Sequence, residues 1–387
     1  MTAIAPGDAR ALTRALVRVD SRNPTLVPGA PGEGPCAAEL RDVLDAWGFR
    51  TELHDAAPGR PNLVARIGGG GPHSVGRSLM FNGHLDVVGV DGMIHPPFAA
   101  DEREGRLYGR GSADMKGGIA AMCAAALRAV LAGVRGEIVV AAVADEEYES
   151  LGTRALLAHG VRADACVVAE PTRLAIMPAH RGFVWLEVEI TGRAAHGSRW
   201  DIGVDAIRHA GLLLAELDAY DAHVLPVRTH PLLGRGSLHA SRIEGGTGMS
   251  TYPDRCVLKL ERRTIPGEAA ADAMDEVRAA CDRIRARRAS FAADVRLLVT
   301  QGPSDVAVSS PLVQGLDAAL RAGGERATIE GMSAWTDAAL LNEAGIPAVC
   351  FGPGDISLAH AAEEYIPLDE IDRATAVLAL FAGRWCA

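Results

Sequence analysis

Residues 80–88 read MFNGHLDVV, an apolar run that ends in a glycine and then presents His84 two residues before Asp86. In an extended strand, residues i and i+2 point to the same face, so these two side chains fall on one side of the chain. That spacing lets an imidazole bind a metal ion while the carboxylate holds the imidazole in place. A lone histidine is more often a structural residue, so the hypothesis depends on what the rest of the sequence adds.

The same pattern, an apolar run that ends in acids or a histidine, recurs along the chain. Runs over residues 136–143, 165–169 and 346–351 lead to Glu146 and Glu147, to Glu170 and to His360, and the segment GRGSAD at 109–114 adds Asp114. Alternating strands and helices with almost unbroken apolar strands predict an α/β fold with a mostly parallel sheet covered on both faces. Sites in such sheets form beyond the carboxyl ends of the strands, which is where these acids and histidines fall. The sequence therefore predicts a metal-dependent hydrolase.

The pattern changes after Gly182. The sequence predicts a strand at 184–190, a helix at 204–217, strands at 237–243 and 255–263, a helix at 268–287 and a strand at 293–300. This β-α-β-β-α-β order is the ferredoxin-like motif. We therefore expect a catalytic domain from residues 1–181 and 301–387, and an inserted lid or dimerisation domain at 182–300. Edge strands of the inserted domain could pair between two copies, which predicts a homodimer.

Composition limits the classes of function. The 387 residues are 48% hydrophobic, enough for a full core, and the net charge is 39 − 49 = −10, which argues against nucleic-acid and anionic-membrane partners. Seven scattered cysteines without a Cys-x-x-Cys pair predict a reduced, cytoplasmic location. We expect no signal peptide, and no membrane span, because the longest apolar stretch, at 119–134, contains Arg128 and is too short.

Seven motifs together carry a family resemblance. They are GHLDVV at 83–88, GRGSADMKGG at 109–118, ADEE at 144–147, AEPT at 169–172, GRAAH at 192–196, RTIPGE at 263–268, and GPG at 352–354 leading to His360. The chain resembles the zinc aminoacylase and carboxypeptidase superfamily, and most closely its acetylornithine deacetylase and succinyl-diaminopimelate desuccinylase members. The motifs span nearly the whole chain in the order of that family, which makes the combination specific.

The resemblance implies a pair of zinc ions, for which Co²⁺ or Mn²⁺ could substitute. It implies that His84 and Glu170 hold one ion, that Glu147 and His360 hold the other, and that Asp114 bridges them. Two such ions about 3.5–4 Å apart suit hydrolysis by a hydroxide bound between them. The resemblance also implies a cis peptide bond between Asp114 and Met115.

The resemblance assigns further roles around the ions. Glu146 is the expected general base, which takes a proton from water and delivers it to the leaving amine. Asp86 is expected to orient His84. From the inserted domain, His196 is expected to polarise the scissile carbonyl, reaching a partner's active site in dimeric relatives, and Arg263 is expected to grip a substrate carboxylate.

Two further positions concern the substrate. Arg181 lies at the predicted domain junction, where it could touch the substrate. Ser250 stands where relatives usually carry an asparagine, so its shorter side chain could shift specificity. Blander interpretations stay open for the acids: Glu146 and Glu147 could form a solvated turn, and Asp114 could cap a helix.

We therefore expect a deacylase that acts on a small N-acyl amino acid or a related amide. One alternative is a dipeptidase or carboxypeptidase of the same superfamily, which shares the chemistry and differs in pocket shape. A second alternative is a non-catalytic binding protein on this fold. That alternative requires the loss of a ligand or of the base, and the sequence retains all six residues.

Overall fold

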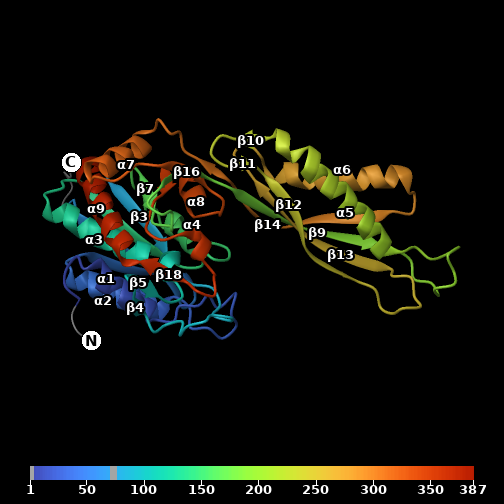
Figure 1. Cartoon of the computed structure of the whole chain (residues 1–387), viewed down its shortest axis with the longest axis horizontal. Helices are drawn as coiled ribbons and strands as arrows, with labels where there is room; N and C mark the ends of the chain where they lie inside the picture. Colours follow the sequence, from blue (N-terminus) through green and yellow to red (C-terminus); the bar gives the residue numbers. More distant parts are fainter. Residues whose placement is uncertain (1–3, 70–75) are drawn as a thin grey trace. The chain divides into compact units, whose positions relative to one another are not determined.

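The computed structural model describes residues 4–69 and 76–387, and their contacts divide the chain into two compact units (Figure 1). The first unit comprises Met1–Pro178, Val306–Glu330 and Thr336–Ala387, and the second comprises Ala179–Asp305 and Gly331–Trp335. These bounds lie within a few residues of the expected domains, except that the short segment 331–335 groups with the second unit. The lid or dimerisation role of that unit stays a prediction.

The main sheet has a parallel centre and antiparallel flanks. Its strand order is β1-β2-β6-β3-β7-β17-β8-β15, with β16 also pairing with β8. The parallel strands are β6 (Glu137–Val143), β3 (Leu79–His84), β7 (Cys166–Val168) and β17 (Ala348–Cys350). The flanking strands are β1 (Arg50–Ala57), β2 (Arg60–Gly68), β8 (Ile176–His180), β15 (Ser304–Asp305) and β16 (Ile329–Met332). The predicted α/β class is thus confirmed.

Both faces of the central strands are buried, which explains their unbroken apolar sequences. In β3 all six residues are buried, and alternate residues face opposite layers. Phe81 packs in the core, and Gly83 lies against Ile119 of the helix α3 (Gly117–Leu131). Asn82 points the other way and donates to Thr153 of α4 (Leu151–Ala158) at 3.4 Å. His84 shares the face of Asn82, and it is the last residue of the strand.

The remaining helices of the first unit complete these two layers (Figure 1). Helices α1 (Ala9–Val17), α2 (Gly34–Ala46), α7 (Pro311–Ala322) and α9 (Leu368–Trp385) share one hydrophobic core with α3. Helix α8 (Ala338–Glu343) packs near α4, against β7 and β17. A small separate sheet has the order β18-β5-β4, from Tyr365–Pro367, Arg106–Tyr108 and Asp101–Arg103. Short helical turns cover Ser112–Lys116 (η1) and Ile356–Leu358 (η3).

Helix α3 approaches the backbone beyond β7 unusually closely at Gly118. A Cβ atom at this position would lie 2.0 Å from the main-chain oxygen of Ala169, the residue before Glu170. Backbone cannot give way as a flexible side-chain end can, so only glycine fits here. The close approach holds the segment that carries Glu170 directly against α3.

Gly118→Ala is expected to lower the free energy of unfolding by at least about 1–3 kcal/mol, because the new methyl group overpacks a rigid contact. The matched control is Gly211→Ala in the helix α5 (Ala206–His223), where nothing lies within 4 Å of the added Cβ. That change should stabilise by about 0.5–1 kcal/mol. Urea unfolding of the two variants tests this, and wild-type stability for Gly118→Ala would contradict the close packing.

The second unit has the predicted ferredoxin-like order. It runs β9 (Gly182–Thr191), α5, β12 (Ser237–Gly245), β13 (Arg255–Thr264), α6 (Ala270–Arg287) and β14 (Ala292–Gln301), with sheet order β12-β13-β9-β14. A helical turn η2 (Leu225–Val227) and a two-residue pair β10 (Thr229–His230) and β11 (Gly234–Arg235) lie between α5 and β12. Along β9, residues of one face are buried in the core that α5 and α6 share, and those of the other are half-exposed.

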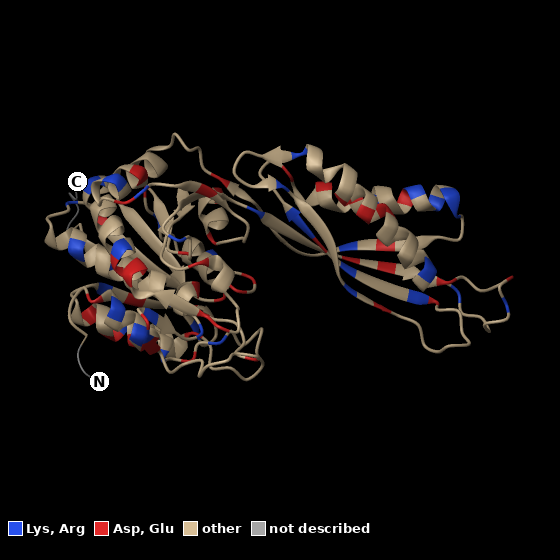
Figure 2. Ribbon diagram, in the orientation of Figure 1, with Lys and Arg blue, Asp and Glu red and all other residues tan. Residues whose placement is uncertain are grey.

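The half-exposed face of this sheet carries alternating charges (Figure 2). Glu189 pairs with Arg255 at 2.7 Å, and Glu187 pairs with Arg296 at 2.8 Å, so charges of opposite sign face each other across neighbouring strands. Cross-strand pairs of this kind favour one register. Strand β12 forms an edge of the sheet, and most of its residues are exposed.

Candidate metal centre

The structure brings the five predicted ligands together in the first unit, around Asp114. The Asp114 Oδ1 atom lies 3.1 Å from His84 Nε2, and its Oδ2 atom lies 3.6 Å from His360 Nε2. One carboxylate therefore faces two imidazoles, one with each oxygen, which is the arrangement a bridging ligand needs. Asp114 lies in η1, and the peptide bond to Met115 is cis, as the resemblance implied.

His84 presents a defined nitrogen to this cluster. Its Nδ1 atom donates to the main-chain oxygen of Asp86 at 2.9 Å, because a carbonyl can only accept. That bond places the proton on Nδ1 in the neutral ring and leaves the Nε2 lone pair for a metal. Burial opposes the charged ring, but the neighbouring carboxylates, led by Asp114, raise the pKa of His84 well above its usual value.

His360 forms the open side of the cluster. Its Nε2 atom lies 2.9 Å from Glu147 Oε2, and its side chain is 53% exposed. The hydrogen bond to Glu147 raises the pKa of His360 to about 9; partial burial opposes that rise, and the negative charges of Glu147 and Asp114 add to it. The structure thus places Glu147 and His360 in contact, and their assignment to one ion stays a prediction.

Glu146 and Glu170 lie beside His84 on the buried side. Potential ligand atoms of these three residues all lie within 4.8 Å of one another, and those of His84, Asp114 and Glu147 form a second such group. Glu146 Oε2 is 3.9 Å from His84 Nε2. Burial, followed by repulsion from neighbouring carboxylates, raises the pKa values of both Glu146 and Glu170 well above the usual range.

This donor set fits divalent metal ions. Carboxylates gathered in a buried site repel one another, and a bound cation relieves that repulsion. The site offers the imidazoles of His84 and His360 and several carboxylates, and neither group of ligand atoms described above contains a thiolate. Such donors suit Zn²⁺, Mn²⁺ or Co²⁺ better than a soft metal.

Asp86 does more in the structure than the sequence suggested. Its carboxylate oxygen lies 3.6 Å from His84 Nδ1, whereas its main-chain oxygen lies 2.9 Å from the same nitrogen. The same carboxylate accepts the main-chain N–H groups of Glu146 at 3.1 Å and Glu147 at 3.3 Å. Burial raises the pKa of Asp86 to about 7. Asp86 therefore holds the loop after β6 as well as lying next to the histidine.

Sequence reasoning missed Glu364 among the residues that hold the cluster, whereas it expected Asp337 to cap a helix or to pack near the site. The buried Glu364 accepts the main-chain N–H groups of Ala113 at 3.0 Å and Asp114 at 3.2 Å, and Arg110 binds its second oxygen at 2.6 Å. Asp337 precedes α8 without capping it and accepts from Thr153 at 2.6 Å. Burial raises the pKa of Asp337 to about 6. In the sequence these are single polar residues without a characteristic spacing.

Four predicted residues lie in the second unit, in two groups. His196 and Ser250 are both exposed and lie on adjacent segments: His196 bridges with Thr251, and the N–H of Gly197 donates to the Ser250 carbonyl at 2.7 Å. His196 Nδ1 lies 2.9 Å from the hydroxyl of Ser198.

Arg181 and Arg263 form the other group. The Arg263 guanidinium lies 5.4 Å from the centre of the Phe183 ring and pairs with Glu261. Arg181 donates to the Leu233 carbonyl at 2.7 Å, and its Nε atom has no hydrogen-bond partner among the described residues. Burial, and then the positive charges of Arg263 and Arg235, lower the pKa of Arg181. Such a group of cations favours an anionic ligand.

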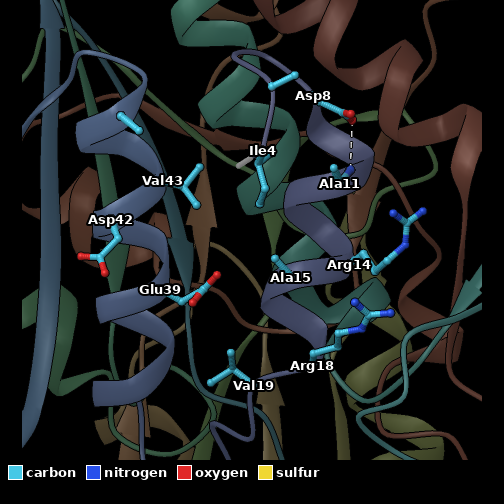
Figure 3. Close-up of a pocket in the computed structure, with 12 residues that line it drawn as sticks. Ile4, Asp8, Ala11, Arg14, Ala15, Arg18, Val19, Glu39, Asp42 and Val43 are labelled. Atoms are coloured by element: carbon cyan, nitrogen blue, oxygen red, sulfur yellow. Dashed lines mark hydrogen bonds between the residues drawn. The ribbon is translucent and has the colours of Figure 1, made fainter. Parts of the chain in front are cut away.

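A separate groove of about 670 Å³ lies between α1 and α2 (Figure 3). Small and apolar side chains such as Ala11, Ala15 and Val43 line it, with charged residues including Arg14 and Glu39. None of the eleven predicted site residues is among the described residues that line it. We therefore place the chemistry at the acidic cluster, where convergent ligands and perturbed pKa values coincide.

Comparison with known proteins gives consistent matches over nearly the whole chain. The sequence matches peptidase family M20/M25/M40 over residues 80–384. Acetylornithine deacetylase of Myxococcus xanthus is 32% identical over 354 residues, which cover 89% of this chain and 90% of that protein. N-formyl-4-amino-5-aminomethyl-2-methylpyrimidine deformylase of Bacillus subtilis (strain 168) is 28% identical over 378 residues, covering 90% and 88%.

A solved structure agrees in fold. The Bacillus subtilis YXEP protein, described as a dinuclear metal binding peptidase of the M20 family, superposes with a TM-score of 0.73 at 17% identity, covering 98% of this chain and 97% of that one. Within the described residues, no helix is long and apolar enough to cross a membrane.

Proposed function

This chain belongs to peptidase family M20/M25/M40 and is a metal-dependent amide hydrolase, and we propose that it removes the acyl group from a small N-acyl amino acid or a related amide. The observation that carries the proposal is the Asp114 carboxylate between His84 and His360, with Glu146 beside it. Two relatives named for removing an acetyl and a formyl group support an acyl substrate.

We assign the metal pair to zinc: His84 and Glu170 would hold one ion, Glu147 and His360 would hold the other, and Asp114 would serve both. Bound there, such ions supply a Lewis acid and lower the pKa of water. The Nδ1 bond to the main-chain oxygen of Asp86 fixes the His84 ring so that Nε2, when it carries no proton, would face this site. The main-chain N–H groups of Glu146 and Glu147 donate to the Asp86 carboxylate, which keeps the proposed base and a proposed ligand in a fixed relation.

Glu146 moves the proton in this proposal. Its carboxylate takes a proton from the attacking water as the C–O bond forms, and then delivers that proton to the amide nitrogen as the C–N bond breaks. A buried carboxyl with a raised pKa holds a proton more readily than an exposed one, which suits the second step. The products are a carboxylic acid and an amine.

The second unit supplies the substrate contacts in this proposal. His196 donates a hydrogen bond to the developing oxyanion, and Arg263 and Arg181 bind the free carboxylate of the substrate. Ser250, next to His196, contributes to specificity. The exposed edge strand β12 is the surface through which we propose a homodimer forms. We also propose a cytoplasmic location, which the seven free, buried cysteines support.

A substrate panel tests the proposal. We expect hydrolysis of acetyl-, formyl- or succinyl-amino acids with a free carboxylate, and a kcat/KM about 10–100-fold lower for the matching carboxamides, because charged hydrogen bonds to arginine are lost. Arg263→Lys, which keeps the charge and removes the planar fork, should reduce that discrimination. Arg278→Lys, an exposed change on α6, is the control. Dipeptides as the best substrates would instead support the peptidase alternative.

A further inference from the structure

Asn23 occupies a position in the first unit that the chemistry described so far does not use. Its side chain is fully buried and makes three hydrogen bonds. The Nδ2 group donates to Asp86 Oδ2 at 2.8 Å and to Asp145 Oδ1 at 3.0 Å, while Oδ1 accepts the N–H of Thr25 at 2.9 Å. Its main-chain N–H donates to Val87 at 2.9 Å. A single amide thus links the loop after β3 to the loop after β6.

The loop after β6 needs such support because its backbone is strained. Asp145 has a φ of +66°, a left-handed conformation that non-glycine residues adopt only when their surroundings enforce it. The next two residues are Glu146 and Glu147, so a small rotation at Asp145 would move the proposed base and a proposed ligand together. The Asp145 carboxylate also accepts the N–H of Glu149 at 3.3 Å, which closes the turn.

A buried ion pair anchors the same residue from the other side. Arg60 donates to Asp145 Oδ1 at 2.6 Å and pairs with Glu33, whose carboxylate accepts the main-chain N–H of Asp145 at 3.2 Å. These three charged side chains are all buried. Asn23 is the link from this anchored Asp145 to Asp86, and Asp86 in turn binds the N–H groups of Glu146 and Glu147.

We propose that Asn23 is a positioning residue for the proposed amide hydrolysis: its amide fixes the separation of Asp86 and Asp145 and thereby places Glu146 and Glu147 at the metal site. The inference rests on the proposed function for its kinetic consequence, but its effect on metal binding is independent of any substrate. Removing an indirect contact of this kind typically costs 10–100-fold in activity or metal affinity.

The test compares Asn23→Leu, which keeps the branched shape of the side chain and removes the amide, with Asn342→Leu. Asn342 is the control, since its amide also bonds both ways to another segment: its Nδ2 donates to the Ala348 carbonyl and its Oδ1 accepts the Ala348 N–H, each at 2.9 Å, on β17. Three quantities are measured for full-length protein: kcat and KM on the best amide of the panel, the visible absorption spectrum and affinity of the Co²⁺-loaded protein, and the urea midpoint. Asn23→Ser, which leaves space for water, replaces the leucine variant if that variant does not fold.

We expect Asn23→Leu to lower kcat by about 10–100-fold with KM within about threefold, to weaken Co²⁺ binding by a similar factor and to shift the Co²⁺ bands. Asn342→Leu should lower the urea midpoint and leave kcat and the spectrum unchanged. A folded Asn23 variant with the wild-type spectrum, Co²⁺ affinity and kcat would overturn the proposal. Absence of amide hydrolysis in the wild type would refute the proposed function instead, and the Co²⁺ measurements would still decide the role of Asn23.

Discussion

Glu146→Gln is expected to lower kcat by about 10²–10⁴-fold, the range that general acid–base catalysis contributes. Glutamine keeps the size of the side chain and removes its ability to accept and return a proton. Glu146 belongs to a loop whose main chain is held by Asp86, so the substitution should leave the position of Glu147 unchanged. Metal content, measured by elemental analysis, should therefore stay at the wild-type value while turnover is lost.

The matched control is Glu149→Gln, three residues along the same turn. Glu149 is exposed, and its contact with Asp145 is made by the main chain, which the substitution leaves intact. We expect wild-type kcat for this variant. An equal loss of kcat in both variants would show that any substitution in this turn disrupts the site. Wild-type kcat in Glu146→Gln would show that Glu146 is not the general base.

Four of the proposed site residues could be located from the sequence because they end or follow an apolar strand. In the structure His84 ends β3, Glu146 and Glu147 follow β6, and Glu170 follows β7. Since these strands are parallel neighbours, their carboxyl ends meet at one edge of the sheet. The family resemblance added what periodicity alone does not give, namely the division of ligands into two sets and the bridging role of Asp114.

The supporting contacts could not be predicted, because they join residues far apart in the sequence. Asn23 meets Asp145 across 122 positions, and Glu364 meets Asp114 across 250. Neither residue has a periodic neighbour or a motif, so each reads as an isolated polar residue in a loop. Their partners are decided by the strand order, which places β6 beside β3 and which local sequence patterns do not specify.

The antiparallel flanks of the main sheet have a similar explanation. Strand β1 is largely exposed or half-exposed, whereas β2 is buried along most of its length. The polar sequence of β1, RTELHDAA, gives no apolar alternation that would separate an edge strand from a loop. Its pairing with β2 depends on a tight connection between residues 57 and 60, which brings the strands together in antiparallel register.

Removal of divalent metal ions should abolish activity and also destabilise the first unit. The cluster gathers carboxylates of Asp86, Asp114, Glu146 and Glu170 that are all but fully buried. Without cations, burial and the repulsion between these carboxylates favour protonation and raise the pKa values of Glu146 and Glu170, although His84 opposes the rise. Chelated protein should recover activity with Zn²⁺, Co²⁺ or Mn²⁺. It should gain about 4 kcal/mol of stability for each ion bound at a metal concentration of 1,000 times Kd.

Asp114→Ala distinguishes stabilisation by bound metal ions from a general effect of added salt. Asp114 faces both imidazoles, so its removal should weaken the binding of both ions and abolish most of the metal-dependent rise in the thermal midpoint. Glu146→Gln, which removes the proposed base and none of the five proposed ligands, should keep that rise although it is inactive. The two variants thus have the same activity and opposite thermal responses, because metal binding and proton transfer depend on different carboxylates. Full activity in protein shown to contain no divalent ion would refute the metal dependence itself.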